Sequence, residues 1–289
     1  MNGYIRILIA WLLGACSITS YFPQSLHHTY IPMLENRHGP QRQRPIVGVW
    51  IDGPIGGRDR WLAEQSVVEV STRYNDLPAV VQLQINHRVI VGVHSQDPEV
   101  YRSWASIRPA YIEVLSDGFY NEPEMYMTPG EYAGLLRAVY PIIKGMATGS
   151  HRTMVIAGAL IHPSSGWWAQ VQALAGQSYD VVSFHHYVHW PNVDTAEMCQ
   201  QARYLRQLQT ATGLQSAAPV YLTETAVRCS GACEGDFEAG QVAWFYGVLN
   251  SGCVDLVGWY TLANNGWENT DMVQWDAPRP VWYEYQALR

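Results

Sequence analysis

The chain has 289 residues, a formal net charge of −7 and 15% charged residues. This length suits one large domain, and an eight-stranded barrel typically needs ~250 residues. The acidic balance, without a basic stripe, argues against a nucleic-acid partner. The chain has 12 Trp and 18 Tyr against 5 Phe. These flat side chains with a polar handle suit sugar-binding clefts, although we expect most of them to pack in the core.

The N-terminal segment has the pattern of an export signal. Residues 5–15 are apolar apart from Arg6, and the run is too short to span a bilayer, as in a secretory signal peptide. Residues 13–16, Leu-Gly-Ala-Cys, resemble the lipobox of bacterial lipoproteins, which implies cleavage before Cys16 and its lipidation. Ordinary cleavage a few residues later is the alternative. We expect a signal peptide over 1–16, a tether or irregular cover over 17–44, and an exported protein, either secreted or anchored to the cell envelope.

From residue 45 onward, short β-branched runs alternate with helical runs, which is typical of βα units. Strands are predicted over residues 45–51, 66–71, 88–94, 111–115, 153–160, 180–187, 220–224 and 256–262. Helices are predicted over residues 58–65, 77–86, 98–106, 129–144, 167–175, 195–212, 237–250 and 281–288. Thr128 and Glu131 form a capping box with a proline between them, which marks the start of the fourth helix. The eight units predict an α/β fold, a single-domain (β/α)8 TIM barrel over residues 45–289.

Two of these strands deliver a glutamate. The fourth leads to Asn121-Glu122-Pro123, and the seventh ends in Thr223-Glu224. All strands of a parallel barrel end on the same face, so the two acids would share one gap. Two carboxylates across one gap are what glycoside cleavage requires. The alternative is that both are surface glutamates that happen to follow strands.

These features resemble the retaining glycoside hydrolases of clan A. The resemblance covers the barrel and is carried by the following motifs: Asn121-Glu122-Pro123 after strand four, His185-His186-Tyr187 on strand six, Thr223-Glu224 on strand seven and Trp259 on strand eight. It implies a (β/α)8 barrel with the acid/base after strand four, the nucleophile after strand seven, and no metal or organic cofactor. The segment 115–120 is longer than in the family pattern. Either this loop is expanded, or the register differs and Glu113 or Asp117 takes part.

The hypothesis is therefore a double displacement on a β-glycosidic bond. Glu224 would be the nucleophile, and Glu122 would first donate a proton and then act as a base. The resemblance implies that Asn121 contacts the sugar 2-hydroxyl, with a turn cap as the alternative. It also implies that Arg73, after strand two, hydrogen-bonds Glu224, with a solvated loop arginine as the alternative.

Strand six and strand eight supply the remaining candidates. Side chains alternate along a strand, so His185 and Tyr187 should face the barrel axis and His186 the other side. The resemblance implies that Tyr187 hydrogen-bonds the nucleophile and that Trp259 is the platform under the sugar. His186 has the ordinary interpretation of a core histidine.

Two alternative functions stay open. A non-catalytic carbohydrate-binding barrel is favoured by the longer segment before Glu122. A metal-dependent hydrolase would use His185, His186 and His189, although alternation separates the first two and no acidic cluster accompanies them. We expect a carbohydrate partner, no nucleic acid, membrane contact only through a lipid on Cys16, and a monomer.

Four cysteines remain in the expected mature chain: Cys199, Cys229, Cys233 and Cys253. Export permits disulfides, and the two that lie four positions apart could close a small loop just after Glu224. Zinc is disfavoured because no second closely spaced pair accompanies them. Spacing does not determine the pairing, which is left open.

Overall fold

The computed structural model describes residues 44–63, 66–116, 123–146, 152–211, 218–229, 233, 235–263, 270–274 and 277–288. All of these residues belong to one compact unit that spans residues 43–289. The predicted signal peptide, the lipidation of Cys16 and, apart from Arg44, the tether lie outside the described residues. Within the described ranges, no helix combines the length and apolar character needed to cross a bilayer.

Eight parallel strands form the centre of this unit. They are β1 (Ile46–Ile51), β2 (Val67–Ser71), β3 (Arg88–Val93), β4 (Tyr111–Val114), β5 (Met154–Leu160), β6 (Val181–His189), β7 (Val220–Arg228) and β8 (Leu256–Trp259). They pair in chain order, and β8 closes the barrel by pairing with β1. The predicted (β/α)8 barrel is confirmed. The main differences in bounds are that β7 continues beyond Glu224 and that β8 ends at Trp259.

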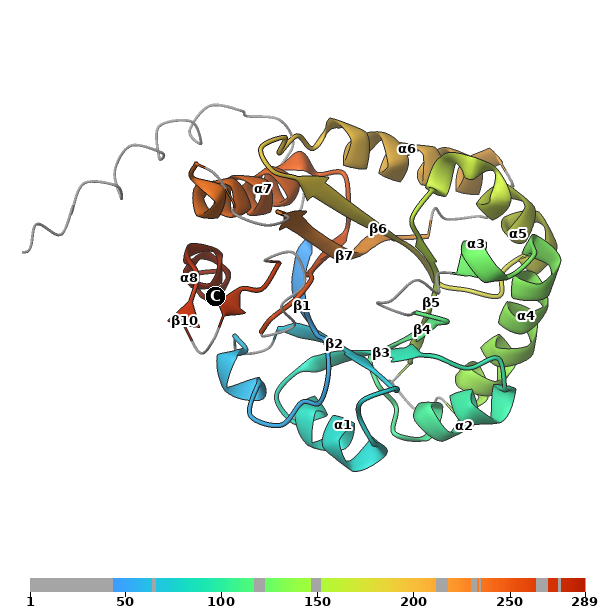
Figure 1. The fold of residues 1–289 in the computed structure, drawn as a ribbon. Helices are drawn as coiled ribbons and strands as arrows, with labels where there is room; N and C mark the ends of the chain where they lie inside the picture. Colours follow the sequence, from blue (N-terminus) through green and yellow to red (C-terminus); the bar gives the residue numbers. More distant parts are fainter. Residues whose placement is uncertain are drawn as a thin grey trace, which may run out of the picture. The chain divides into compact units, whose positions relative to one another are not determined.

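The longer helices surround the ring of strands (Figure 1). They are α1 (Leu77–Gln84), α2 (Pro98–Ser106), α4 (Pro129–Gly145), α5 (Trp167–Ala175), α6 (Ala196–Ala211), α7 (Phe237–Ser251) and α8 (Pro280–Gln286). Short elements that were not predicted are α3 (Pro123–Tyr126), η3 (Pro163–Ser165), β9 (Val273–Gln274) and β10 (Ala277–Pro278). Where a helix was predicted over residues 58–65, the described part contains only the 3-10 turn η2 (Asp59–Trp61).

Local sequence explains why α4 begins where it does. The Thr128 hydroxyl accepts the backbone N–H of Glu131 at 3.3 Å, and the Glu131 carboxylate accepts the backbone N–H of Thr128 at 2.8 Å. These bonds satisfy N–H groups that the first turn leaves without intrahelical partners. Pro129 occupies the first helical position, where a missing N–H costs nothing. The predicted capping box is confirmed.

Alternation along the strands separates two apolar layers. Outward side chains pack against the helices, as Val68, Val91 and Val182 do. Inward side chains fill the amino-terminal part of the barrel, and these are Val67, Ile90, Tyr111, Ile156, Val181, Tyr221 and Leu256. Toward the carboxyl ends of the strands the inward positions become polar, which is the face where TIM barrels carry their chemistry.

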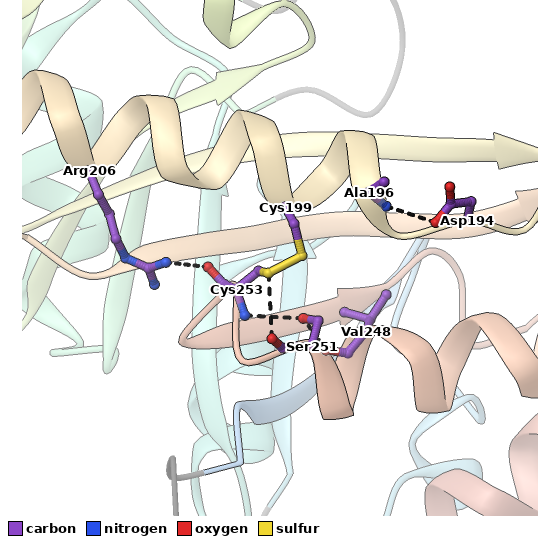
Figure 2. The surroundings of a disulfide bond; sticks show 7 residues. All are labelled: Asp194, Ala196, Cys199, Arg206, Val248, Ser251 and Cys253. Carbon is purple, nitrogen blue, oxygen red and sulfur yellow. Dashed lines mark hydrogen bonds between the residues drawn. A yellow bond between two sulfur atoms is a disulfide. The ribbon is translucent and has the colours of Figure 1, made fainter. Parts of the chain in front are cut away.

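The cysteines pair in two disulfides. Cys199 on α6 joins Cys253 in the segment between α7 and β8, with Cα atoms 5.2 Å apart (Figure 2). Arg206, also on α6, donates to the Cys253 carbonyl and lies 2.9 Å from the Asp255 carboxylate. The second disulfide, Cys229 to Cys233, closes a small loop directly after β7.

Candidate active site

A bulge in β7 turns two consecutive side chains into the barrel. Leu222 and Glu224 pair with consecutive residues of β6, so β7 carries one additional residue, Thr223, over this stretch. Strict alternation would send Thr223 and Glu224 to opposite faces. Instead, the Thr223 hydroxyl donates to the buried Glu113 carboxylate at 3.0 Å, while Glu224 also lies inside, 2% exposed. The bulge thus aims Glu224 at the barrel interior, as bulges near active sites commonly do.

The neighbouring strand leaves room for this bulge. Gly258 on β8 lies so close to it that an added Cβ would be 2.3 Å from the Thr223 carbonyl oxygen. Any side chain at this position would push the bulge away from β8. A glycine is therefore required here for close backbone approach.

Glu224 is held by two side chains of β6. The Tyr187 hydroxyl donates to Oε2 of Glu224, and Nδ1 of His185 lies 3.5 Å from the same oxygen. Both residues face the barrel interior, on the side that alternation predicts. A hydroxyl that donates to a carboxylate favours its ionised form, so this arrangement suits a carboxylate that stays charged.

The two adjacent histidines of β6 differ in environment. Burial lowers the pKa of His185 to about 4, against the opposing effect of the Glu113 charge, so its imidazole is neutral at neutral pH. His186 points to the helices, where its ring stacks on Trp244 with centroids 5.9 Å apart and its Nδ1 lies 3.1 Å from Oε1 of Gln201. His186 is thus a core histidine with a hydrogen-bond partner.

Two further glutamates lie inside the barrel. Glu69 on β2 and Glu113 on β4 are 2% and 0% exposed. Oε1 of Glu113 accepts hydroxyls of Ser183 at 2.6 Å and Thr223 at 3.0 Å. The long segment that follows Glu113 made it an alternative candidate for a role in catalysis. Glu69 was not considered, although its place in the middle of an apolar predicted strand was a usable signal.

The aromatic side chain that faces this group is Tyr260. Its hydroxyl donates to Oδ2 of Asp52 at 2.9 Å. Its ring centroid lies 6.0 Å from that of Tyr187 and 5.8 Å from that of Trp50. The residues Asp52, Tyr260 and Tyr187 therefore connect the end of β1 to Glu224.

Trp259, expected as the sugar platform, is placed differently. It is 1% exposed, its ring packs edge-on against Phe245 of α7 at 5.9 Å, and its Nε1 donates to the Thr270 carbonyl at 2.9 Å. Leu256 begins β8 on the inner face, so alternation sends Trp259 outward and the next residue, Tyr260, inward. The structure does not bring Trp259 to the group around Glu224.

The predicted acid/base lies outside the described residues, as do Asn121 and Asp117. Pro123, which follows Glu122 directly, is buried at the start of α3. One oxygen of Glu124, Oε1, accepts the backbone N–H groups of Ile161 at 2.8 Å and His162 at 2.6 Å. These two residues follow β5, so α3 is fixed at the carboxyl end of that strand.

Arg73 follows β2 and is exposed, with its backbone N–H donating to the Ser71 hydroxyl at 3.1 Å. Its predicted bond to Glu224 stays a prediction. Among the residues that the structure describes, no three His, Cys, Asp or Glu side chains cluster in a way that could hold a metal ion.

The closed eight-stranded barrel is the fold of the clan A glycoside hydrolases that the sequence resembles. Glycoside hydrolases of known structure share it. A family 39 glycoside hydrolase from the gut symbiont Bacteroides cellulosilyticus WH2 has a TM-score of 0.63 at 16% identity, over 84% of this chain and 63% of that protein. A glucosidase from Croceicoccus marinus has a TM-score of 0.60 at 13% identity, over 84% of this chain and 66% of that protein. A GH128 (subgroup II) endo-β-1,3-glucanase from Sorangium cellulosum has a TM-score of 0.55 at 12% identity, over 84% of this chain and 97% of that protein.

At these identities the similarity establishes the fold. The chain spans 63% of the Bacteroides enzyme. No protein-family model matches the chain, and no curated protein sequence matches it.

Proposed function

We propose that this protein is a retaining hydrolase of β-glycosidic bonds, with Glu224 as the nucleophile and Glu122 as the acid/base. The observation that carries the proposal is the buried Glu224 carboxylate in the middle of β7, turned inward by the bulge and held by the Tyr187 hydroxyl. A barrel shared with glycoside hydrolases supports the assignment.

In the first step, Glu224 attacks the anomeric carbon while Glu122 gives its proton to the leaving oxygen. The glycosidic bond breaks and a glycosyl ester forms on Glu224. In the second step, Glu122 takes a proton from water, whose oxygen displaces Glu224 and releases the sugar. The Tyr187 hydroxyl favours the charged form of Glu224, which the first step needs.

Glu122 is assigned from its sequence position. It precedes Pro123, whose helix α3 is fixed to the carboxyl end of β5 by Glu124. The carboxyl ends of the strands form the face that carries catalytic residues in such barrels. A retaining mechanism requires the carboxyl groups of Glu122 and Glu224 ~5–5.5 Å apart.

The substrate we propose is a β-linked poly- or oligosaccharide. Structural neighbours of this chain include endo-β-1,3-glucanases, one of them in complex with laminarihexaose, so β-1,3-glucans are the first compounds to test. We further propose export, with secretion or a lipid anchor on Cys16 as the two forms to distinguish.

The test is a panel of β-linked glucans, mannans and aryl β-glycosides, followed by NMR of the first-formed anomer. We expect turnover of at least one compound with retention of configuration, and loss of turnover in Glu224→Gln and Glu122→Gln with the fold kept. Glu99→Gln, on the exposed face of α2, is the matched control and should keep wild-type activity. Saturable binding without turnover would instead favour the carbohydrate-binding barrel, and inversion of configuration would exclude the double displacement.

A further inference from the structure

Two carboxyl groups are buried together beneath the candidate nucleophile. The inward side chains of Glu69 and Glu113 lie on β2 and β4, and their carboxyls are within hydrogen-bonding reach of each other. Both are almost fully removed from water. Two adjacent carboxylates in such a place repel each other and lack hydration, so both cannot be ionised at low cost. One proton should therefore reside in this pair.

The surrounding donors indicate where the charge sits. Oε1 of Glu113 accepts two hydroxyls, from Ser183 and Thr223. Oε1 of Glu69 accepts one, from Ser116 at 3.3 Å. The Oε2 atoms of both glutamates are buried without a donor among the described residues. A proton on Glu69 that is shared with Glu113 supplies this donor and leaves the charge on Glu113, which has more hydroxyl donors.

The electrostatic environment agrees with this assignment. Burial raises the pKa of Glu69 well above its ordinary value, and the charges of Glu113 and Glu224 raise it further. The other titratable groups near the pair are His185 on β6 and Tyr132 on α4. His185 is neutral at neutral pH, and burial raises the pKa of Tyr132, so neither group compensates the negative charge.

We propose that Glu69 and Glu113 are positioning residues that share one proton, and that their single negative charge anchors the β7 bulge and sets the acidic limb of the pH–activity profile. The anchor is the hydroxyl of Thr223, the residue before Glu224. A fixed negative charge beneath Glu224 disfavours a second one, so more alkaline conditions are needed to ionise Glu224 than without the pair. The effect on activity rests on the proposed function of Glu224.

The shared proton can be tested without any activity assay, through the pH dependence of urea unfolding. A proton held by the folded state and released on unfolding stabilises the fold at low pH. This stabilisation is lost as pH rises above the ordinary glutamate value, by up to tenfold per pH unit in the unfolding equilibrium. Glu69→Gln should remove this component, whereas Glu99→Gln on α2 should keep it. Identical pH dependence in Glu69→Gln and wild type would overturn the shared proton.

If Glu69→Gln does not fold, infrared spectroscopy of the wild type with isotope-labelled glutamate replaces the unfolding test. A protonated carboxyl band at neutral pH is expected from the buried pair, and it should persist in Glu122→Gln, which lacks the proposed general acid. The absence of any such band would overturn the proposal.

The charge of the pair is tested by pH profiles of kcat/KM. Glu69→Gln leaves the charge on Glu113, so it should move the acidic limb little. Glu113→Gln removes the charged member, because burial keeps Glu69 protonated, and it should move the acidic limb to lower pH by about half to one unit, as should the double variant. Equal and additive shifts in the two single variants would mean that both groups are charged, and would overturn the proposal.

The two proposals can fail separately. A wild-type protein that lacks glycosidase activity but shows the expected pH dependence of urea unfolding would refute the proposed function and leave the shared proton standing.

Discussion

The bond between Tyr187 and Glu224 is the contact whose removal is most informative. Tyr187→Phe deletes the hydroxyl that donates to Oε2 of Glu224. It keeps the ring, which packs near Tyr260 and under the Arg228 guanidinium. A hydrogen bond to a charged group contributes about 1.5–3 kcal/mol, which corresponds to about 10- to 150-fold in kcat/KM if the bond supports the ionised nucleophile.

Tyr187→Phe should also shift the pH dependence of kcat/KM in a predictable direction. Without its hydroxyl donor, the ionised form of Glu224 loses stabilisation relative to the protonated form. The acidic limb of kcat/KM should therefore move to higher pH, by about one to two units. The assay is a pH series of initial rates on the best compound of the panel.

A matched control is available on the helical layer. Tyr246 on α7 donates its hydroxyl to Oε2 of Glu284 on α8, so Tyr246→Phe makes the same chemical change outside the barrel. It should leave kcat/KM and the acidic limb unchanged. A Tyr187→Phe variant that cannot be distinguished from Tyr246→Phe in both measurements would refute the reasoning.

Three further changes test other parts of the structure. Gly258→Ala places a Cβ 2.3 Å from the Thr223 carbonyl oxygen, so urea unfolding should show a loss of about 1–3 kcal/mol, and unchanged stability would argue against the close approach. Replacing Cys199 and Cys253 by serine removes a cross-link between residues 54 positions apart; the expected loss is roughly 4 kcal/mol, and an equally stable variant would contradict it. Burial lowers the pKa of His185 to about 4, so its neutral form stabilises the fold above pH 6.5 and this contribution is lost as pH falls toward 4. The pH dependence of unfolding between these values should therefore weaken in His185→Gln, and an unchanged dependence would exclude a neutral buried imidazole.

The sequence was sufficient to predict the barrel because each unit repeats the same local signals. Short β-branched runs that alternate with helical runs, and helix caps such as Thr128, are all local properties. The two-residue period of β6 alone places His185 and Tyr187 on one side of the strand and His186 on the other.

Other features depend on contacts between strands that are distant in sequence. The bulge at Thr223 is defined by the register of β7 against both neighbours, which a single strand does not specify. At β8, the family resemblance pointed to Trp259, whereas alternation from the inward-facing Leu256 places Tyr260 inside the barrel. Glu69 was missed because a glutamate in the middle of a strand has no counterpart in the family motifs.

The most direct test of the central claim is covalent trapping of the nucleophile. A 2-deoxy-2-fluoro glycoside of the sugar found active, with a good leaving group, should form a long-lived glycosyl ester with the enzyme. Peptide mapping by mass spectrometry should find the sugar on Glu224, and Glu224→Gln should stay unlabelled. A label on any other carboxyl group, Glu113 included, or wild-type turnover by Glu224→Gln would contradict the account.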